Sequence, residues 1–314
     1  MQLMLKEARR PGNRGLITSS RPRGNSSALD RQSRQASAWL LARIMEGRAG
    51  CSRTTLDEAL AFHFSSQGSQ KRMRLALQTG SRLGLDTHCT LRIAASCEVI
   101  HNASLIHDDL QDRQRSRRQQ DALWQRFGPE IAICAGDYLL SRAYSLLAET
   151  KRNPGELIII THQAVARLIR GQCQDLDQRG RSLCGPARCR DIAIAKSADL
   201  IALPVDLCLV CADQTEHRQA VRTIAEHLAV GYQAMDDLDD QAEDAETGSP
   251  NLVNALARRW DNPVERTRAI AHRSLRSAQL KARAVPEAVG GGLAELADQL
   301  LKRLTPQGDR EPQS

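Results

Sequence analysis

The chain has 314 residues, a mass of 34.7 kDa and 41% hydrophobic residues, enough to bury a sizeable core, but only 3% are aromatic, so that core must be mainly aliphatic. The net charge of +7 is concentrated in residues 1–53, which hold eleven Lys and Arg against three Asp and Glu; the nearly neutral remainder and the scarcity of aromatic stacking surfaces exclude nucleic acid as the expected partner. No apolar run reaches the roughly eighteen residues of a membrane span, so we predict no transmembrane segment.

The N-terminal region, residues 1–35, is rich in Arg, Ser, Gly and Pro and almost free of acidic residues. It lacks the apolar stretch of a secretory signal. This composition predicts a flexible basic arm. An organelle transit peptide has a similar composition and stays open as an alternative.

Residues 36–305 show the apolar periodicity of α-helices. Residues Trp39 to Met45 open a helix, and Thr55 and Glu58 have capping-box spacing at the start of another. We therefore predict an all-α, single-domain helical bundle around a central cavity, with a polar tail at 306–314. Longer helical stretches, separated by Gly, Pro or polar breaks, are predicted at 89–112, 129–149, 154–178, 189–212, 214–245 and 262–281.

The nine cysteines show no paired spacing, which indicates a reducing compartment and therefore the cytoplasm. Cys208 and Cys211 form a CxxC pair on an apolar stretch without a second pair or a nearby His. We interpret them as packed thiols of the core rather than zinc ligands.

A first acidic cluster lies in the stretch HDDLQD. On a helix Asp108 and Asp112 share a face, with Asp109 beside them. Like charges at this spacing repel, and burying them unpaired is costly, so a multivalent cation is the natural compensating group. The alternative is a solvated acidic face balanced by the arginines that follow, namely Arg113, Arg115, Arg117 and Arg118.

A second cluster, DDLDD, weakens that alternative. Asp236 and Asp240 are again four residues apart, with Asp237 and Asp239 interleaved. Both clusters end apolar helices that could face each other across a bundle, and their carboxylates are the hard oxygen ligands that Mg²⁺ prefers. Together they predict a site for Mg²⁺ and a diphosphate.

The order of motifs resembles the trans-isoprenyl diphosphate synthases, which are head-to-tail prenyltransferases with two aspartate-rich motifs. The resemblance runs from about Gly68 to Asn254. HDDLQD matches the first motif and DDLDD the second. Between and around them, in the family's order, stand GSQKRMRL, the arginine pair, AGDYLL, GQCQDL, KSADL and YQAMDD.

The resemblance implies a role for each matched residue, and it also implies a homodimer. Asp108, Asp112, Lys196 and Asp236 are the expected catalytic residues. Up to three Mg²⁺ ions would be bound by Asp108, Asp109, Asp112, Asp236, Asp237 and Asp240. The allylic diphosphate would be bound by Arg117, Lys196, Ser197 and Gln233, and isopentenyl diphosphate by Lys71, Arg74, His101 and Arg118.

Several positions depart from the family pattern. The glycines expected before Lys71 and after the arginine pair are replaced, so we expect loops of a different shape. The lysine expected after the second motif is absent, so we expect weaker binding of the allylic substrate. The departing residues are Ser69, Gln70, Leu75, Gln119, Ser197 and Ser249.

The product is predicted from the residues that precede the first motif. Ser104 lies one turn before Asp108, and in the resembling family the residues at positions 103 and 104 help to limit chain growth. Ala103 and Ser104 are both small, which together with the stretch IHNASL favours geranylgeranyl diphosphate. A longer polyprenyl or a farnesyl product, a terpene cyclase and a non-catalytic subunit are the alternatives.

Overall fold

The computed structural model describes residues 24–44, 53–66, 68–179 and 184–304. Part of the predicted arm (residues 1–23), Met45 at the end of the first predicted helix, and the tail at 306–314 lie outside the described residues. The described part of the arm is helical, because α1 (Gly24–Ile44) begins well before residue 35. Ser33 and Ala36 of α1 are buried, so this segment belongs to the fold.

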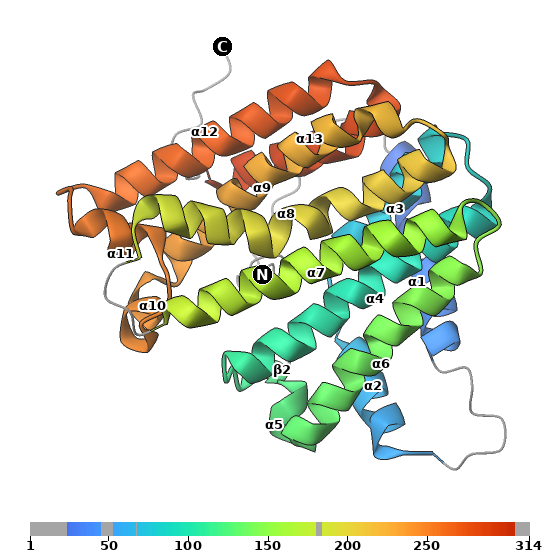
Figure 1. The fold of residues 1–314 in the computed structure, drawn as a ribbon, viewed down its shortest axis with the longest axis horizontal. Helices are drawn as coiled ribbons and strands as arrows, with labels where there is room; N and C mark the ends of the chain where they lie inside the picture. Colours follow the sequence, from blue (N-terminus) through green and yellow to red (C-terminus); the bar gives the residue numbers. More distant parts are fainter. Residues whose placement is uncertain (1–23, 45–52, 67, 180–183, 305–314) are drawn as a thin grey trace, which may run out of the picture. The chain divides into compact units, whose positions relative to one another are not determined.

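The described chain is almost entirely helical, which confirms the predicted all-α class (Figure 1). The chain divides into two compact units, Met1–Ile158 and Ile159–Ser314, called here the N-terminal and C-terminal units. Helix α7 (Pro154–Gln178) contains the division point near its start.

The N-terminal unit is built around α4 (Thr87–Gln111), which packs against α3 and α6. Every α4 residue from Ile93 to Ile106 is buried, so this helix has no solvent face over that length. Small side chains allow the close packing, and the Ser96 hydroxyl donates to the Ala143 carbonyl over 3.2 Å. The other elements are α2 (Thr55–Ser65), α3 (Lys71–Arg82), β1 (Ser116–Arg117), β2 (Gln120–Asp121), α5 (Leu123–Phe127) and α6 (Pro129–Ala148).

The capping box of α2 lies one residue earlier than predicted. Thr54 is the N-cap residue, its backbone N–H donates to Asp57 over 2.8 Å, and Asp57 N–H donates to the Thr54 hydroxyl over 3.4 Å. The prediction of Thr55 and Glu58 was therefore wrong in register. Thr54 with Asp57 and Thr55 with Glu58 both have the capping-box spacing. The N-cap is the residue directly before the first helical residue, and Thr54 holds that position.

The C-terminal unit is centred on α9 (Arg218–Asp239), which packs against α8 (Pro186–Cys211), α12 (Pro263–Ala284) and α13 (Glu287–Leu304) (Figure 1). Cys208 and Cys211 of α8 are fully buried, which confirms their interpretation as core thiols. The predicted helix at 214–245 consists of three pieces: η2 (Thr215–His217), α9 and α10 (Gln241–Thr247).

Four of the described helices were absent from the prediction: α3, α5, α11 (Leu252–Ala257) and α13. Helix α13 contains the run Gly290 to Gly292, which disfavours a helix by intrinsic propensity. The glycine at 290 has a packing reason. A Cβ atom there would lie 1.9 Å from the carbonyl oxygen of Ala282 on α12, so only glycine permits this contact between α12 and α13.

None of the described helices combines the length and the apolar character needed to cross a bilayer.

We predict that Gly290→Ala lowers the free energy of unfolding by about 1–3 kcal/mol, because the added methyl group forces α12 and α13 apart. Gly155→Ala is the matched control, since a Cβ at this position of α7 meets nothing within 4 Å. The control should be neutral or stabilising by up to about 1 kcal/mol. Chemical denaturation of both variants measures the difference, and equal stabilities would contradict the packing argument.

Candidate active site

The first aspartate motif occupies the last turn of α4 and its C-terminal cap. Asp108 and Asp109 are buried and Asp112 is half-buried. Asp112 is the C-cap residue, and its backbone N–H donates to the Asp108 carbonyl over 2.8 Å. This i, i+4 relation places Asp108 and Asp112 on one face of the helix end, as predicted.

Asp109 is held by an arginine of the predicted substrate site. The Arg117 Nε atom donates to both Asp109 carboxylate oxygens, over 2.8 and 2.6 Å, and the guanidinium makes a further short contact with Oδ1. Burial raises the pKa of Asp109, and the hydrogen bonds and charge of Arg117 oppose that rise. Asp109 therefore orients Arg117 on β1 next to the end of α4.

The arginine pair lies on a two-stranded hairpin. Arg117 pairs with Gln120, and the two residues between them, Arg118 and Gln119, have φ angles of 54° and 64°. Positive φ at both central positions is the signature of a type I′ turn, which normally favours Gly or Asn. The backbone of Gln119 adopts the left-handed conformation that glycine favours, and the expected difference in loop shape stays a prediction. Arg118 donates to the Ser66 carbonyl over 2.8 Å.

The predicted isopentenyl diphosphate residues Lys71 and Arg74 lie in the first turn of α3. Backbone N–H groups and the positive end of the helix dipole favour an anion at such a position. Arg74 forms an ion pair of 2.6 Å with Asp30 of α1. Gln70, at the N-cap of α3, has φ 49° and ψ 30°, again a left-handed conformation.

His101 lies in a buried polar region of α4. Its side chain is 4% exposed, and its Nδ1 atom has no hydrogen-bond partner among the described residues. Burial lowers the pKa of His101 well below the usual value, and the charges of Arg72, Arg118 and Arg117 lower it further. The His101 imidazole is therefore neutral. It can form hydrogen bonds but adds no positive charge to the site.

Sequence reasoning missed the residues that connect α2, α3 and α4. Asn102 donates to the Glu98 carbonyl over 2.8 Å, and its amide oxygen lies 2.9 Å from His63 Nε2. Glu98 accepts the Met73 backbone N–H over 3.4 Å, and burial raises the pKa of Glu98. Burial lowers the pKa of His63 to about 4. Each residue in isolation reads as an ordinary helix position, so no local pattern signals this network.

The AGDYLL motif packs against the first aspartate motif through His107. A Cβ atom on Gly136 would lie 2.1 Å from His107 Nε2, so a side chain at 136 would displace that ring. His107 also lies 3.7 Å from the Asp137 carboxylate. Gly136 and Asp137 thus set the position of the residue directly before Asp108.

The two predicted chain-length residues differ in accessibility. Ala103 is fully buried, whereas Ser104 is 8% exposed. The Ser104 hydroxyl donates to the His101 carbonyl over 2.7 Å. Both residues count as buried, so an enlarged side chain at either position would have to displace neighbouring side chains, with the tighter packing at Ala103.

The second aspartate motif lies at the end of α9. Its second residue, Asp237, is held by hydrogen bonds within the C-terminal unit. Asp237 accepts Gln233 Nε2 over 2.8 Å on one oxygen and the Leu252 backbone N–H over 2.7 Å on the other. Its carbonyl accepts Asn251 Nδ2 over 2.9 Å. Burial raises the pKa of Asp237 to about 7, and the two side-chain hydrogen bonds oppose the rise. Asp236 is also buried, and Asp240 is the C-cap residue of α9.

Lys196 is positioned by α7. Its Nζ atom donates to Asp175 Oδ2 over 2.7 Å, and Arg179 lies 3.5 Å from the same oxygen. Gln172, one turn earlier, is 7% exposed, and neither atom of its amide group has a hydrogen-bond partner among the described residues. Gln172 and Asp175 belong to the GQCQDL motif and were not among the predicted site residues. Ser197 is half-buried beside Lys196.

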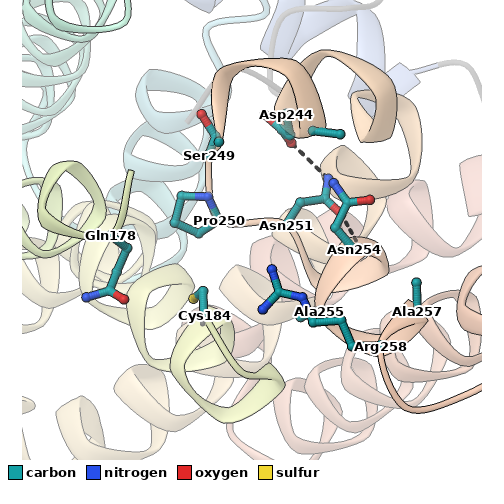
Figure 2. A pocket seen from close by; sticks show the side chains of 12 residues that line it. Gln178, Cys184, Asp244, Ser249, Pro250, Asn251, Asn254, Ala255, Ala257 and Arg258 are labelled. Atoms are coloured by element: carbon teal, nitrogen blue, oxygen red, sulfur yellow. Dashed lines mark hydrogen bonds between the residues drawn. The ribbon is translucent and has the colours of Figure 1, made fainter. Parts of the chain in front are cut away.

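A pocket of about 330 Å³ lies beside α10 and α11 in the C-terminal unit (Figure 2). Asn251 donates to Asp244 over 2.8 Å, and the Arg258 side chain points into the pocket. Burial raises the pKa of Asp244 to about 6, and the nearby acidic residues Asp240, Glu243 and Asp175 contribute. Ser249, which stands where a lysine was expected, lines the same pocket.

The carboxylates of each motif suit a magnesium ion that takes some of its ligands from the protein and the others from a substrate. Among the residues that the structure describes, no three His, Cys, Asp or Glu side chains are close enough to form a metal cage by themselves. Mg²⁺ usually binds through one or two carboxylates, with waters and substrate phosphates as its remaining ligands. The pairs Asp108 with Asp112 and Asp236 with Asp240 match this mode.

Comparisons with known proteins agree with the fold and the family that the motifs indicate. Residues 53–253 match the family model for polyprenyl synthetase. The chain is 31% identical over 208 residues to a (2E,6E)-farnesyl diphosphate synthase of Mycobacterium tuberculosis, a match that covers 65% of this chain and 57% of that protein. It is 26% identical to a geranylgeranyl pyrophosphate synthase of Geoglobus acetivorans over 59% of each chain.

The fold is shared with a decaprenyl diphosphate synthase of Rhodobacter capsulatus. The TM-score is 0.78 at 20% identity, over 90% of this chain and 98% of that one. The chain belongs to the polyprenyl synthetase family, since the family model matches more than half of its length. The match spans little more than half the length of the mycobacterial protein.

We predict that Gln119→Gly raises the free energy of unfolding by about 1 kcal/mol, because glycine adopts the left-handed conformation of this turn without strain. Gln163→Gly, at an exposed position within α7, is the matched control and should lower that free energy by about 1 kcal/mol. Thermal or urea denaturation compares the two. Destabilisation by both substitutions would show that the hairpin does not hold Gln119 at positive φ in solution.

Proposed function

We propose that this protein catalyses the Mg²⁺-dependent head-to-tail condensation of isopentenyl diphosphate with an allylic diphosphate. The main support is the arrangement shared by the two motifs. In each motif the second aspartate, Asp109 or Asp237, is fixed by hydrogen bonds. The first and last aspartates of each motif lie one turn apart at the end of a helix. Family membership and the ordered motifs support the same reaction.

Each carboxylate pair would bind Mg²⁺, which when bound neutralises charge on the departing diphosphate. Asp108 and Asp112 supply one pair of ligands and Asp236 and Asp240 the other. Asp109 and Asp237 are proposed to support them, the former by orienting Arg117 and the latter by anchoring the end of α9 to α11. This refines the predicted six-ligand set into four direct ligands and two orienting residues.

The cations divide between the two substrates. Arg117 and Lys196, with Ser197 and Gln233, are proposed to contact the allylic diphosphate. Lys196 is held by Asp175, so its ammonium group is already oriented before substrate arrives. The isopentenyl diphosphate is proposed to bind Lys71, Arg74, Arg118 and the neutral His101.

The condensation then proceeds between the two bound substrates. Loss of diphosphate leaves an allylic cation, the isopentenyl double bond attacks it, and the released diphosphate accepts the proton that is lost. The buried amide of Gln172 lies one turn from Asp175, and we propose that it faces the allylic substrate. This gives a polar partner to an amide that otherwise makes no hydrogen bond within the described residues.

Geranylgeranyl diphosphate is the proposed product, supported by the small residues at 103 and 104. Relatives are named for farnesyl, geranylgeranyl and longer products. We further propose a homodimer, which the resemblance implies, and a cytoplasmic location, which the eight free cysteines of the described chain support.

The proposal is tested by incubating the protein with Mg²⁺, labelled isopentenyl diphosphate and each allylic starter, and sizing the products by chromatography. Asp108→Ala and Asp236→Ala should each lower turnover by about 100-fold or more, because each removes charge stabilisation in the transition state. Asp239→Ala is the control, since Asp239 is exposed and lies inside the second motif. Absence of elongation by folded wild-type protein rejects the proposed reaction; equal turnover of all variants rejects the metal assignment.

Product length is tested at the two positions before the first motif. Ser104→Phe should shorten the product, because the ring would occupy the space next to the growing chain. Ala103→Phe should shorten the product as well but also destabilise the fold by about 1–3 kcal/mol, since Ala103 is fully buried. Ser141→Phe, at an exposed position of α6, is the control. An unchanged product distribution in Ser104→Phe would place the limit of chain growth elsewhere.

A further inference from the structure

The turn that begins α3 contains the proposed isopentenyl diphosphate cations but lacks glycine at its entry. Gln70 occupies the N-cap position with φ 49°, and its side chain makes no capping hydrogen bond to α3. A non-glycine residue in the left-handed region is disfavoured by roughly 1–2 kcal/mol. Some contact outside α3 must therefore hold Gln70 in place.

That contact comes from α1. The Ser33 hydroxyl donates to the Gln70 side-chain oxygen over 2.9 Å, and Ser33 is only 3% exposed. This partly buried hydrogen bond joins side chains 37 residues apart, and the burial of Ser33 favours it over a hydrogen bond to water.

Two further residues on the same face of α1 reach the same turn of α3. Asp30 forms the 2.6 Å ion pair with Arg74, and the Ser37 hydroxyl lies 3.6 Å from the Met73 sulfur. Positions 30, 33 and 37 lie on one side of a helix. They contact residues 74, 70 and 73, so one face of α1 lies against the start of α3.

The opposite side of this turn is fixed by α4. Glu98 accepts the Met73 backbone N–H over 3.4 Å. Helix α3 is therefore held from two sides, by α4 at its backbone and by α1 at its side chains. Of these two contacts, the one from α1 reaches Gln70, the residue with positive φ.

We propose that Ser33, with Asp30, is a positioning residue for the isopentenyl diphosphate site, a role that rests on the proposed function. Ser33 holds Gln70 in the left-handed conformation and so sets the direction of the Lys71 and Arg74 side chains. Asp30 orients the Arg74 guanidinium, whose five N–H donors can serve a carboxylate and a phosphate together. The Ser33 hydroxyl thereby stabilises, at position 70, the left-handed conformation that a glycine would adopt without support.

The test compares Ser33→Ala, Gln70→Gly and the double variant in steady-state elongation. Ser33→Ala should raise KM for isopentenyl diphosphate roughly tenfold, with kcat and KM for the allylic substrate unchanged. Gln70→Gly should return KM to near the wild-type value in the double variant, because glycine needs no support at positive φ. Ser33→Thr, which keeps the hydroxyl, should retain a KM close to wild type.

Hydrogen exchange of the amides at positions 70–74 supplies a readout that does not need activity. Exchange should be faster in Ser33→Ala and should return to the wild-type rate in the double variant. Wild-type protein without elongation activity but with this exchange pattern would reject the proposed reaction while keeping the role of Ser33 in holding the turn. An unchanged KM and unchanged exchange in Ser33→Ala, or failure of Gln70→Gly to restore either, overturns the proposal. If Ser33→Ala does not fold, Ser33→Thr with a raised KM also overturns it.

Discussion

Burying a carboxylate at the C-terminal end of a helix is the physical difficulty on which the rest of this structure depends. The carbonyl groups there already present partial negative charge, so an added carboxylate is disfavoured twice, by desolvation and by the dipole. Asp109 and Asp237, both 2% exposed, meet this difficulty differently. Asp109 is neutralised by Arg117, whereas Asp237 receives an amide and the first backbone N–H of α11, at a helix N-terminus where anions are favoured. Each solution joins an aspartate motif to a second element, which gives the motif a defined shape.

A second constraint concerns the backbone of the loops that carry cations. Gln70 and Gln119 both occupy left-handed positions where the resembling family has glycine. This chain adopts the left-handed conformation without the residue that adopts it most easily, so its cost must be offset by tertiary contacts. At Gln70 the contact is the buried Ser33 hydroxyl. At Gln119 the cross-strand pairing of Arg117 with Gln120 closes the turn on both sides. The loops therefore keep their geometry through packing rather than through local propensity.

The helical class, most of the long helices and both aspartate motifs could be predicted from the sequence because each depends on local spacing. The hydrogen-bond partners of Asp109 and Asp237, the second aspartate of each motif, could not be predicted. Arg117 is eight residues from Asp109, and Leu252 is fifteen residues from Asp237 and acts through its backbone, which no side-chain pattern records. Helix α13 was missed because its glycines oppose helix formation locally, and they are tolerated because α12 approaches closely at Gly290. Helix α3 was read as a loop because the basic stretch around Lys71 was interpreted by charge, although its apolar face packs on α4.

Small residues before the first aspartate motif fit two physical requirements, close packing of α4 and the proposed space for a growing chain. Helix α4 packs against α3 and α6, so small side chains along it are required by close packing alone. Ala103, with no exposed surface, is fully explained in this way. Ser104 is also buried, but it keeps 8% of its surface exposed, and its hydroxyl donates to the His101 carbonyl one turn from Asp108. If chain growth is limited near the first motif, a larger residue at 104 acts from the turn that precedes Asp108, and the size of residue 103 acts mainly through the position of α4.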